Sequence, residues 1–228
     1  MRITLDGPVA RTALVVWSLF AASACFVACC LPYLLFERLI GWQASHGALW
    51  LGALSLTPVG PGLRGLLASA HAMVDARGHA DAPVRRFATA IRHSSQGLRT
   101  LWWALPALAL LLGYDLALYG TTVPAMPILV VAAGGLLALI LIAASLAGTD
   151  EHRLPALLNR VLKAGVRRPY LPLTWVFLLS LALLATRLPL VGPSLLLFAP
   201  ATWAVAVDVV NRVWGQPGVA RGVARKES

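Results

Sequence analysis

Long apolar stretches alternate with shorter segments that carry most of the charges along this 228-residue chain. Each apolar stretch is about 20 residues long or somewhat longer, which is the length that an α-helix needs to cross ~30 Å of hydrocarbon. The pattern predicts an all-α, polytopic membrane protein with about six transmembrane helices in a single integral membrane domain over 1–228. The predicted spans are 12–36, 47–73, 99–120, 123–147, 169–186 and 189–213, followed by a short basic tail over 214–228.

The basic residues are distributed unevenly over the predicted loops. With the N-terminus in the cytoplasm, all of the 19 lysines and arginines except Arg38 and Arg187 lie on or toward the cytoplasmic side. Such a bias is typical of bacterial inner-membrane proteins, in which cytoplasmic loops are rich in lysine and arginine. Five spans would place either the N-terminal or the C-terminal arginines outside. We therefore expect a multi-pass protein of the bacterial cytoplasmic membrane with both termini in the cytoplasm.

Composition agrees with this class of protein. Hydrophobic residues make up 59% of the chain and charged residues only 12%, whereas soluble domains are about 45–50% apolar. The net charge of +10 is explained by loops that face anionic lipids, which are the expected partner. Nucleic acid is not an expected partner, because no basic patch is interleaved with aromatic residues.

Two long cytoplasmic loops, 74–98 and 148–168, are each expected to hold an amphipathic helix. In the first loop, Pro83 is placed to start a helix that carries Phe87, Ile91 and Leu98 with arginines around them. Such helices suit the membrane surface, with the apolar side toward the lipid and the bases toward headgroups. In the second loop, Pro155 precedes Leu157, Leu158, Val161 and Leu162.

The same two loops share a short pattern. Arg92-x4-Gly97-x-Arg99 matches Arg160-x4-Gly165-x-Arg167 at an offset of 68 residues, and each copy leads into an apolar stretch. An internal repeat and a coincidence in sequence of low complexity both explain the match. The candidate surface contacts are Arg92, Arg99, Arg160 and Arg167.

The second apolar stretch is interrupted by two prolines and two glycines, Pro58, Gly60, Pro61 and Gly62. A continuous helix is not expected there, because proline removes a backbone donor and glycine loosens the chain. One interpretation is a discontinuous helix that lines a binding site, and the other is a packing kink. The small residues Gly62, Gly65, Ser69 and Ala72 follow at helical spacing and favour close approach of another helix.

Three charged residues, Arg64, Asp115 and Asp208, fall inside predicted spans and away from the ends of those spans. Arg64 and Asp208 both lie in the inner half of the bilayer, so they are candidates for a buried pair. The alternatives are a local i, i+4 pair of Asp208 with Arg212 and an Arg64 side chain that reaches toward the headgroups. Asp115 lies in the outer half of the third span and either binds a cation or proton or faces water.

No motif for catalysis, a metal or a cofactor accompanies these charges. The five histidines share no ligand spacing and fall in or near predicted loops. The three cysteines lie together in the first span, where packing explains them better than metal binding. We therefore expect no cofactor and no enzymatic activity.

The run from Leu56 to Leu66, LTPVGPGLRGL, resembles the "GPAxxAL" element of the YesL-like (DUF624) family of bacterial membrane proteins. The similarity extends over about 50–170, and Gly62 and Arg64 replace small residues of the family pattern. The resemblance implies no established biochemical activity. It implies an accessory role beside carbohydrate-uptake ABC transporters, whose components would be partners.

Three hypotheses follow for the function. The leading one is a non-enzymatic accessory or scaffold of a carbohydrate transport system. The second is a small transporter or channel that uses the broken second helix with Arg64 and Asp208. The third, a membrane-embedded enzyme, has no positive support in the sequence.

Overall fold

The computed structural model describes residues 8–43, 45–75, 83–92, 96–119, 134, 170–185 and 197–213. The described residues form helices and no strands, so the all-α prediction is confirmed for this part of the chain. The helices are α1 (Pro8–Leu39), α2 (His46–Ser55), α3 (Val59–Asp75), α4 (Pro83–Arg92), α5 (Gln96–Tyr119), α8 (Tyr170–Ala185) and α10 (Ala199–Val213).

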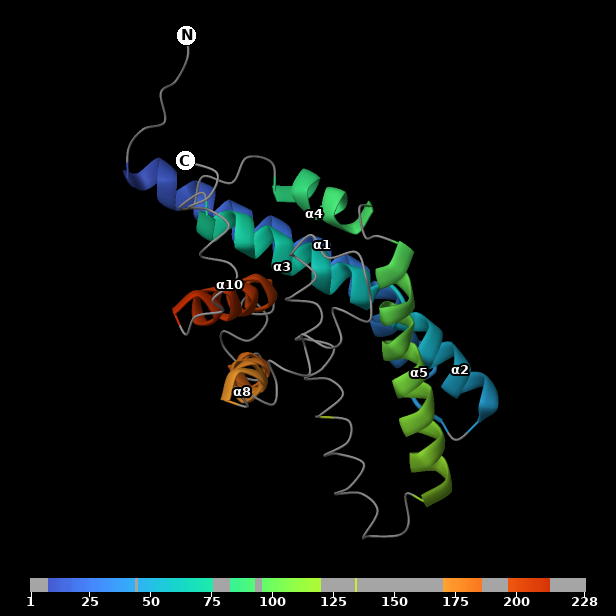
Figure 1. The fold of residues 1–228 in the computed structure, drawn as a ribbon. Helices are drawn as coiled ribbons and strands as arrows, with labels where there is room; N and C mark the ends of the chain where they lie inside the picture. Colours follow the sequence, from blue (N-terminus) through green and yellow to red (C-terminus); the bar gives the residue numbers. More distant parts are fainter. Residues whose placement is uncertain are drawn as a thin grey trace.

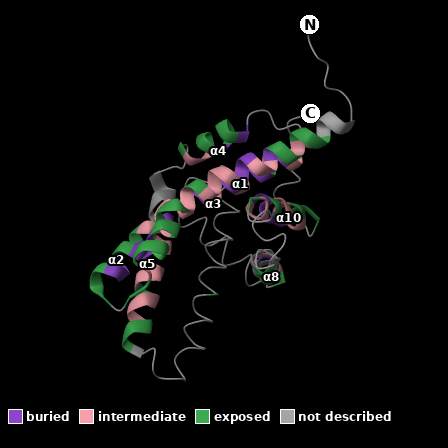
Figure 2. Ribbon diagram, turned by 180° about the vertical axis from the view of Figure 1, so that it is seen from behind, coloured by how far each residue is buried: buried purple, intermediate pink, exposed green. Residues whose placement is uncertain are grey.

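Helix α3 lies at the centre of the packing and contacts α1, α4 and α10 along its length (Figure 1). Helix α1 runs antiparallel to the α2–α3 segment, because Phe36 packs at Gly52 while Cys29 packs at Gly62. Figure 2 shows buried residues on α1 and α3 where the two helices meet, whereas much of α2 and α4 is exposed and most of α5 is intermediate. The core around α3 includes Ala22, Leu66, Ala70, Met73, Phe87, Trp175, Ala201, Trp203, Ala204 and Val207.

The interruption predicted in the second apolar stretch is present. Helix α2 ends at Ser55, residues 56–58 form turns, and α3 begins at Val59. The carbonyls released by the break are bonded locally: Thr57 donates to Leu54 O from its N–H at 3.1 Å and from its hydroxyl at 2.7 Å. The Ser55 hydroxyl donates to Gly52 O at 2.6 Å. Local donors therefore bond the Leu54 and Gly52 carbonyls at the break, as backbone at membrane depth requires.

Helices α4 and α5 pair with the two arms of this broken segment. Helix α4 lies beside α3 (Figure 1) and inserts the Phe87 ring at Gly65. Helix α5 runs antiparallel to α2, with Trp102 at Gly60 and Gly113 at Leu49. Each arm of the broken segment is thus covered by a different helix.

The position of α4 corrects the expectation for its environment. A helix does begin at Pro83, as predicted, but it ends at Arg92, and Leu98, which was expected on the same helix, lies in α5. Its apolar side, however, is taken up by the protein, since Phe87 is buried and Ile91 packs partly against the core cluster. The glycine at position 65 leaves a gap on α3 that accepts the Phe87 ring. Phe87 and part of Ile91 therefore pack against the protein, while Val84 on the same helix stays 52% exposed.

Near its start, α10 is joined to α1 and α8 by two specific hydrogen bonds. The Ala201 N–H near the start of α10 donates to the buried Ser23 hydroxyl of α1 at 3.0 Å. This bond satisfies one of the unpaired donors that every helix start exposes. The Trp203 Nε1 donates to Trp175 O of α8 at 3.3 Å.

Only α1, among the described helices, is long and apolar enough to cross a membrane, over Thr12–Leu39. Shorter apolar helices cover Trp102–Leu118 and Ala199–Val210. Of the predicted spans, 123–147 lies outside the described residues apart from Gly134. The second predicted loop helix, within 148–168, also lies outside them.

Large apolar side chains cover much of the outside of these helices. Isolated exposed apolar residues are ordinary, but an extended apolar exterior is unusual for a soluble protein. The exposed set includes Trp17, Leu31, Leu35, Trp50, Leu54, Trp103, Leu111, Leu118, Leu173, Phe177, Leu181 and Leu184.

Candidate functional site

Four charged or titratable side chains meet where α3 and α10 cross. Asp208 lies between two partners, with its Oδ1 2.9 Å from His71 Nδ1 and its Oδ2 2.8 Å from Arg212 Nε. Arg212 also reaches across to α3, where its Nη1 lies 2.6 Å from Asp75 Oδ1. His71 Nε2 closes the ring of contacts at 3.2 Å from Asp75 Oδ2. We call these four residues, His71, Asp75, Asp208 and Arg212, the α3–α10 cluster.

The proton on His71 decides which of its contacts are hydrogen bonds. Its Nδ1 lies 2.9 Å from Asp208 Oδ1 and 3.0 Å from Arg212 Nη2. A carboxylate can only accept and a guanidinium can only donate, so the two contacts are alternatives. With a proton on Nδ1 the histidine binds Asp208, and without that proton it accepts from Arg212. The cluster joins the helices in either state.

The cluster suits an inter-helix lock better than a reaction centre. It consists of one guanidinium, two carboxylates and an imidazole, and none of its four members is a hydroxyl or thiol nucleophile. The described residues contain no group of three or more His, Cys, Asp or Glu side chains that could hold a metal ion. Asp208 is the least exposed member, at 15%, so solvent screens its contacts with His71 and Arg212 the least.

Replacing Asp208 by asparagine is expected to lower the free energy of unfolding by about 1–2 kcal/mol, since it weakens charge-assisted bonds that are partly screened by solvent. The matched control is Asp115→Asn on α5, for which a change below about 0.5 kcal/mol is expected. Equilibrium unfolding in mixed micelles measures both. Equal effects of the two variants would show that the cluster does not stabilise the helix contact.

Arg64 does not pair with Asp208. Of the two alternatives for Asp208, the structure has the i, i+4 contact with Arg212. Arg64 instead leaves its Nη1 buried with no hydrogen-bond partner. A buried donor of this kind requires an explanation, such as a bound water or ion.

The residues of the break are used for close packing. Pro58 accepts the Gly62 N–H at 3.0 Å, and Pro61 lies in the first turn of α3, where a missing N–H costs little. A methyl group added at Gly60 would lie 2.7 Å from Trp102 Cε3, and one added at Gly62 would lie 2.8 Å from Cys29 Cβ. Both glycines are therefore covered by neighbouring helices.

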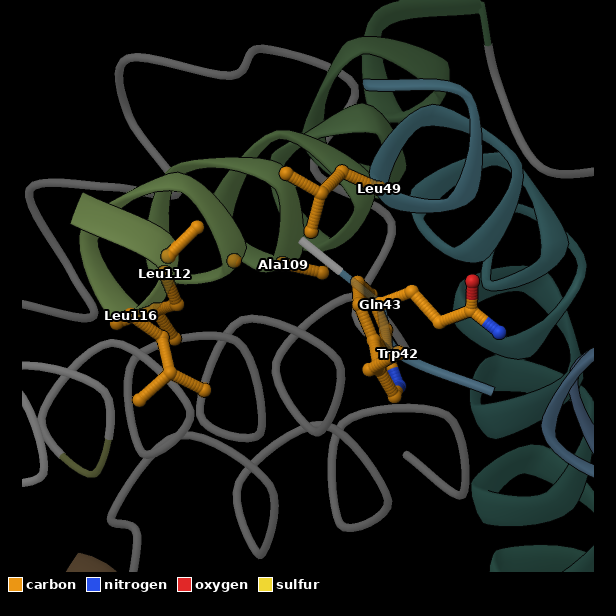
Figure 3. Close-up of a pocket in the computed structure, with 8 residues that line it drawn as sticks. Trp42, Gln43, Leu49, Ala109, Leu112 and Leu116 are labelled. Carbon is orange, nitrogen blue, oxygen red and sulfur yellow. The ribbon is translucent and has the colours of Figure 1, made fainter. Parts of the chain in front are cut away.

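A separate apolar pocket of about 490 Å³ lies between Trp42 and Gln43 before α2, Leu49 of α2 and the C-terminal half of α5 (Figure 3). It does not include the break. Asp115 and Tyr114 belong to the same part of α5, and the Tyr114 hydroxyl lies 2.8 Å from His46 Nδ1. Within the described ranges, no salt bridge joins Asp115 to a basic side chain. The pocket is lined by Trp42, Gln43, Leu49, Ala109, Leu112, Gly113, Leu116 and Ala117.

The candidate surface contacts are only partly described. Arg92 is exposed at the end of α4. The backbone of Arg99 belongs to α5, while its side chain lies outside the described part. Arg160 and Arg167 lie outside it altogether, and so the second copy of the predicted repeat falls outside the described residues.

Sequence reasoning missed His71 and Asp75. Both lie in the last turns of α3, not in a loop. A signal was available, because His71–Asp75 and Asp208–Arg212 are both i, i+4 pairs on helices that end at the same predicted membrane face.

Comparisons with known proteins found no match: no family model, no curated protein and no solved structure matches the chain.

Proposed function

We propose that the chain is a six-span protein of the bacterial cytoplasmic membrane, with both termini in the cytoplasm. The observation that carries the proposal is the apolar exterior of the described helices, which would be solvated by lipid and not by water. The length and composition of α1 support it further. Helices α2 and α3 together, α5 and α8 overlap most of three other predicted spans, and α10 overlaps the C-terminal part of 189–213.

Within this membrane location, we propose a non-enzymatic accessory or scaffold role beside a carbohydrate transport system. The link to carbohydrate transport rests on the YesL-like resemblance. The geometry contributes a candidate contact surface, because Arg85, Arg86 and Arg92 of α4 are exposed. No salt bridge joins any of these three arginines to a carboxylate of the described residues. A basic face of this kind suits an acidic partner surface or anionic headgroups.

Affinity capture from native membranes after mild crosslinking tests the accessory role. Wild-type protein should recover subunits of a transporter, and the double variant Arg85→Glu/Arg86→Glu should recover at least several-fold less. The matched control is Arg38→Glu. Arg38 is an exposed arginine in the last turn of α1, and its replacement should leave the recovery of transporter subunits unchanged. If the wild-type protein recovers no transporter subunit, the accessory role is wrong.

A small transporter remains the second candidate, and the unpaired Arg64 is the observation that favours it. Intramembrane ionisable residues commonly mark substrate or ion pathways. The locally satisfied break and its covered glycines give this candidate less support than the sequence alone did.

A further inference from the structure

Arg64 carries a charge for which the described part of the chain offers no nearby carboxylate. Asp75 and Asp208 are occupied by His71 and Arg212. His71, the nearest member of that cluster on α3, lies seven residues beyond Arg64, or about 10 Å along the helix axis at 1.5 Å per residue.

The other carboxylates are farther away or outside the predicted membrane segments. Asp115 follows Trp102 by 13 residues on α5. Trp102 packs at Gly60, near the start of α3. Asp115 therefore lies about 20 Å along the α5 axis from the point where α5 contacts the start of α3. Glu37 is exposed near the end of α1. The remaining acids of the sequence, all outside the predicted apolar stretches, are Asp6, Asp81, Asp150, Glu151 and Glu227.

The surroundings of Arg64 favour negative charge. Arg64 is the sixth residue of α3, close to the N-terminal end of that helix. That helix end carries a partial positive charge of its own. A guanidinium with a buried, unbonded Nη1 is costly in a medium of low dielectric constant unless an anion pairs with it.

We propose that Arg64 binds a phosphoryl oxyanion supplied from outside the chain. A guanidinium presents a rigid planar fork of donors that matches phosphate oxygens in a bidentate arrangement. Phosphoryl groups are also the oxyanions that surround a membrane protein in quantity, as lipid headgroups and as free phosphate. The proposal rests on the membrane location proposed above for its choice of ligand.

Two probes distinguish the sources of the phosphoryl group. In neutral detergent and a phosphate-free buffer, inorganic phosphate is titrated and the melting temperature is followed. In parallel, the protein is placed in phosphatidylcholine nanodiscs with or without phosphatidylglycerol, and native mass spectrometry counts the anionic lipids that it retains. Wild-type protein should respond in at least one arm, and the responding arm identifies the source.

Arg64→Gln should weaken the response in that arm by about ten- to a hundred-fold, the loss expected for one charged hydrogen-bonding partner. Arg64→Lys keeps the charge without the fork and should give an intermediate loss. Without any anion, Arg64→Gln should melt at or above the temperature of the wild type, because it removes an unpaired charge. The control Arg92→Gln, at an exposed position of α4, should behave as wild type throughout.

The proposal is overturned if neither probe gives a response in the wild type, or if Arg64→Gln responds as strongly as the wild type. A lower melting temperature of Arg64→Gln in anion-free buffer, with no effect of either probe, would assign Arg64 a packing role instead. Extraction of native membranes with alkaline carbonate tests the membrane location separately. If the protein stays in the membrane pellet but binds neither probe, the anion site at Arg64 is wrong while the proposed membrane location stands.

Discussion

Replacing Trp102 by alanine is expected to lower the free energy of unfolding by about 3–5 kcal/mol, the range for truncation of a large buried aromatic residue. Trp102 is 4% exposed and its ring lies against Gly60, at the point where α5 meets the start of α3. No side chain is present on Gly60 to fill the resulting space, and so the cavity would remain open. Equilibrium unfolding in mixed micelles measures the loss.

The neighbouring Trp103 provides a matched control in the same helix turn. It is 53% exposed, so Trp103→Ala should change the free energy of unfolding by less than about 1 kcal/mol. Lipid tails or detergent would replace the contacts of its ring. Similar losses in the two variants would contradict the packing of α5 against α3.

Replacing Gly62 by leucine is expected to cost about 2–3 kcal/mol through overpacking. A Cβ at this position would lie 2.8 Å from Cys29 Cβ and 3.2 Å from its Sγ. Because the Cys29 Cβ is bonded directly to the α1 backbone, relief requires the two helices to move apart. Such a movement also loosens the surrounding small-residue contact.

The control for Gly62→Leu is Gly47→Leu in α2, where an added Cβ would meet no atom within 4 Å. That variant should be neutral or slightly stabilising, within about 1 kcal/mol, because leucine is a better helix former than glycine. Thermal unfolding of the two purified variants gives the comparison. A Gly62→Leu protein as stable as the wild type would mean that α1 and α3 are not in close contact.

Local features of the fold follow from the sequence alone. The break before α3 is predicted by Pro58 and Pro61, since proline acts on its own backbone and on the preceding turn. The start of α4 at Pro83 is predicted for the same reason. The small residues of α3 also indicated close packing, which Gly62 and Gly65 now have with α1 and α4.

Contacts between helices could not be predicted in the same way. The pattern of α4 shows an apolar side, but the same pattern fits a lipid surface and a protein groove, and only the gap at Gly65 decides between them. The sequence likewise cannot separate Trp102 from Trp103, because which of two adjacent rings is buried depends on the direction from which α3 approaches. His71 was missed because its partner Asp208 is 137 residues away.

The candidate site was predicted in part. Asp208 was recognised as a charge that needs a partner. Arg64 and Arg212 were the two candidate partners, because both were expected at a similar depth in the membrane. Arg212 prevails because an i, i+4 neighbour is already within reach on the same helix, whereas Arg64 would have to approach across a helix crossing. The unpaired Arg64 remains the residue that packing alone does not explain.

The central claim is that the chain crosses the membrane an even number of times, with both ends in the cytoplasm. Reporter fusions test it most directly, with green fluorescent protein or alkaline phosphatase attached after Ser228 or after Gln43 in the loop that follows α1. We predict fluorescence but no phosphatase activity at Ser228, and phosphatase activity but no fluorescence at Gln43. Phosphatase activity at Ser228, or its absence at Gln43, would contradict the claim.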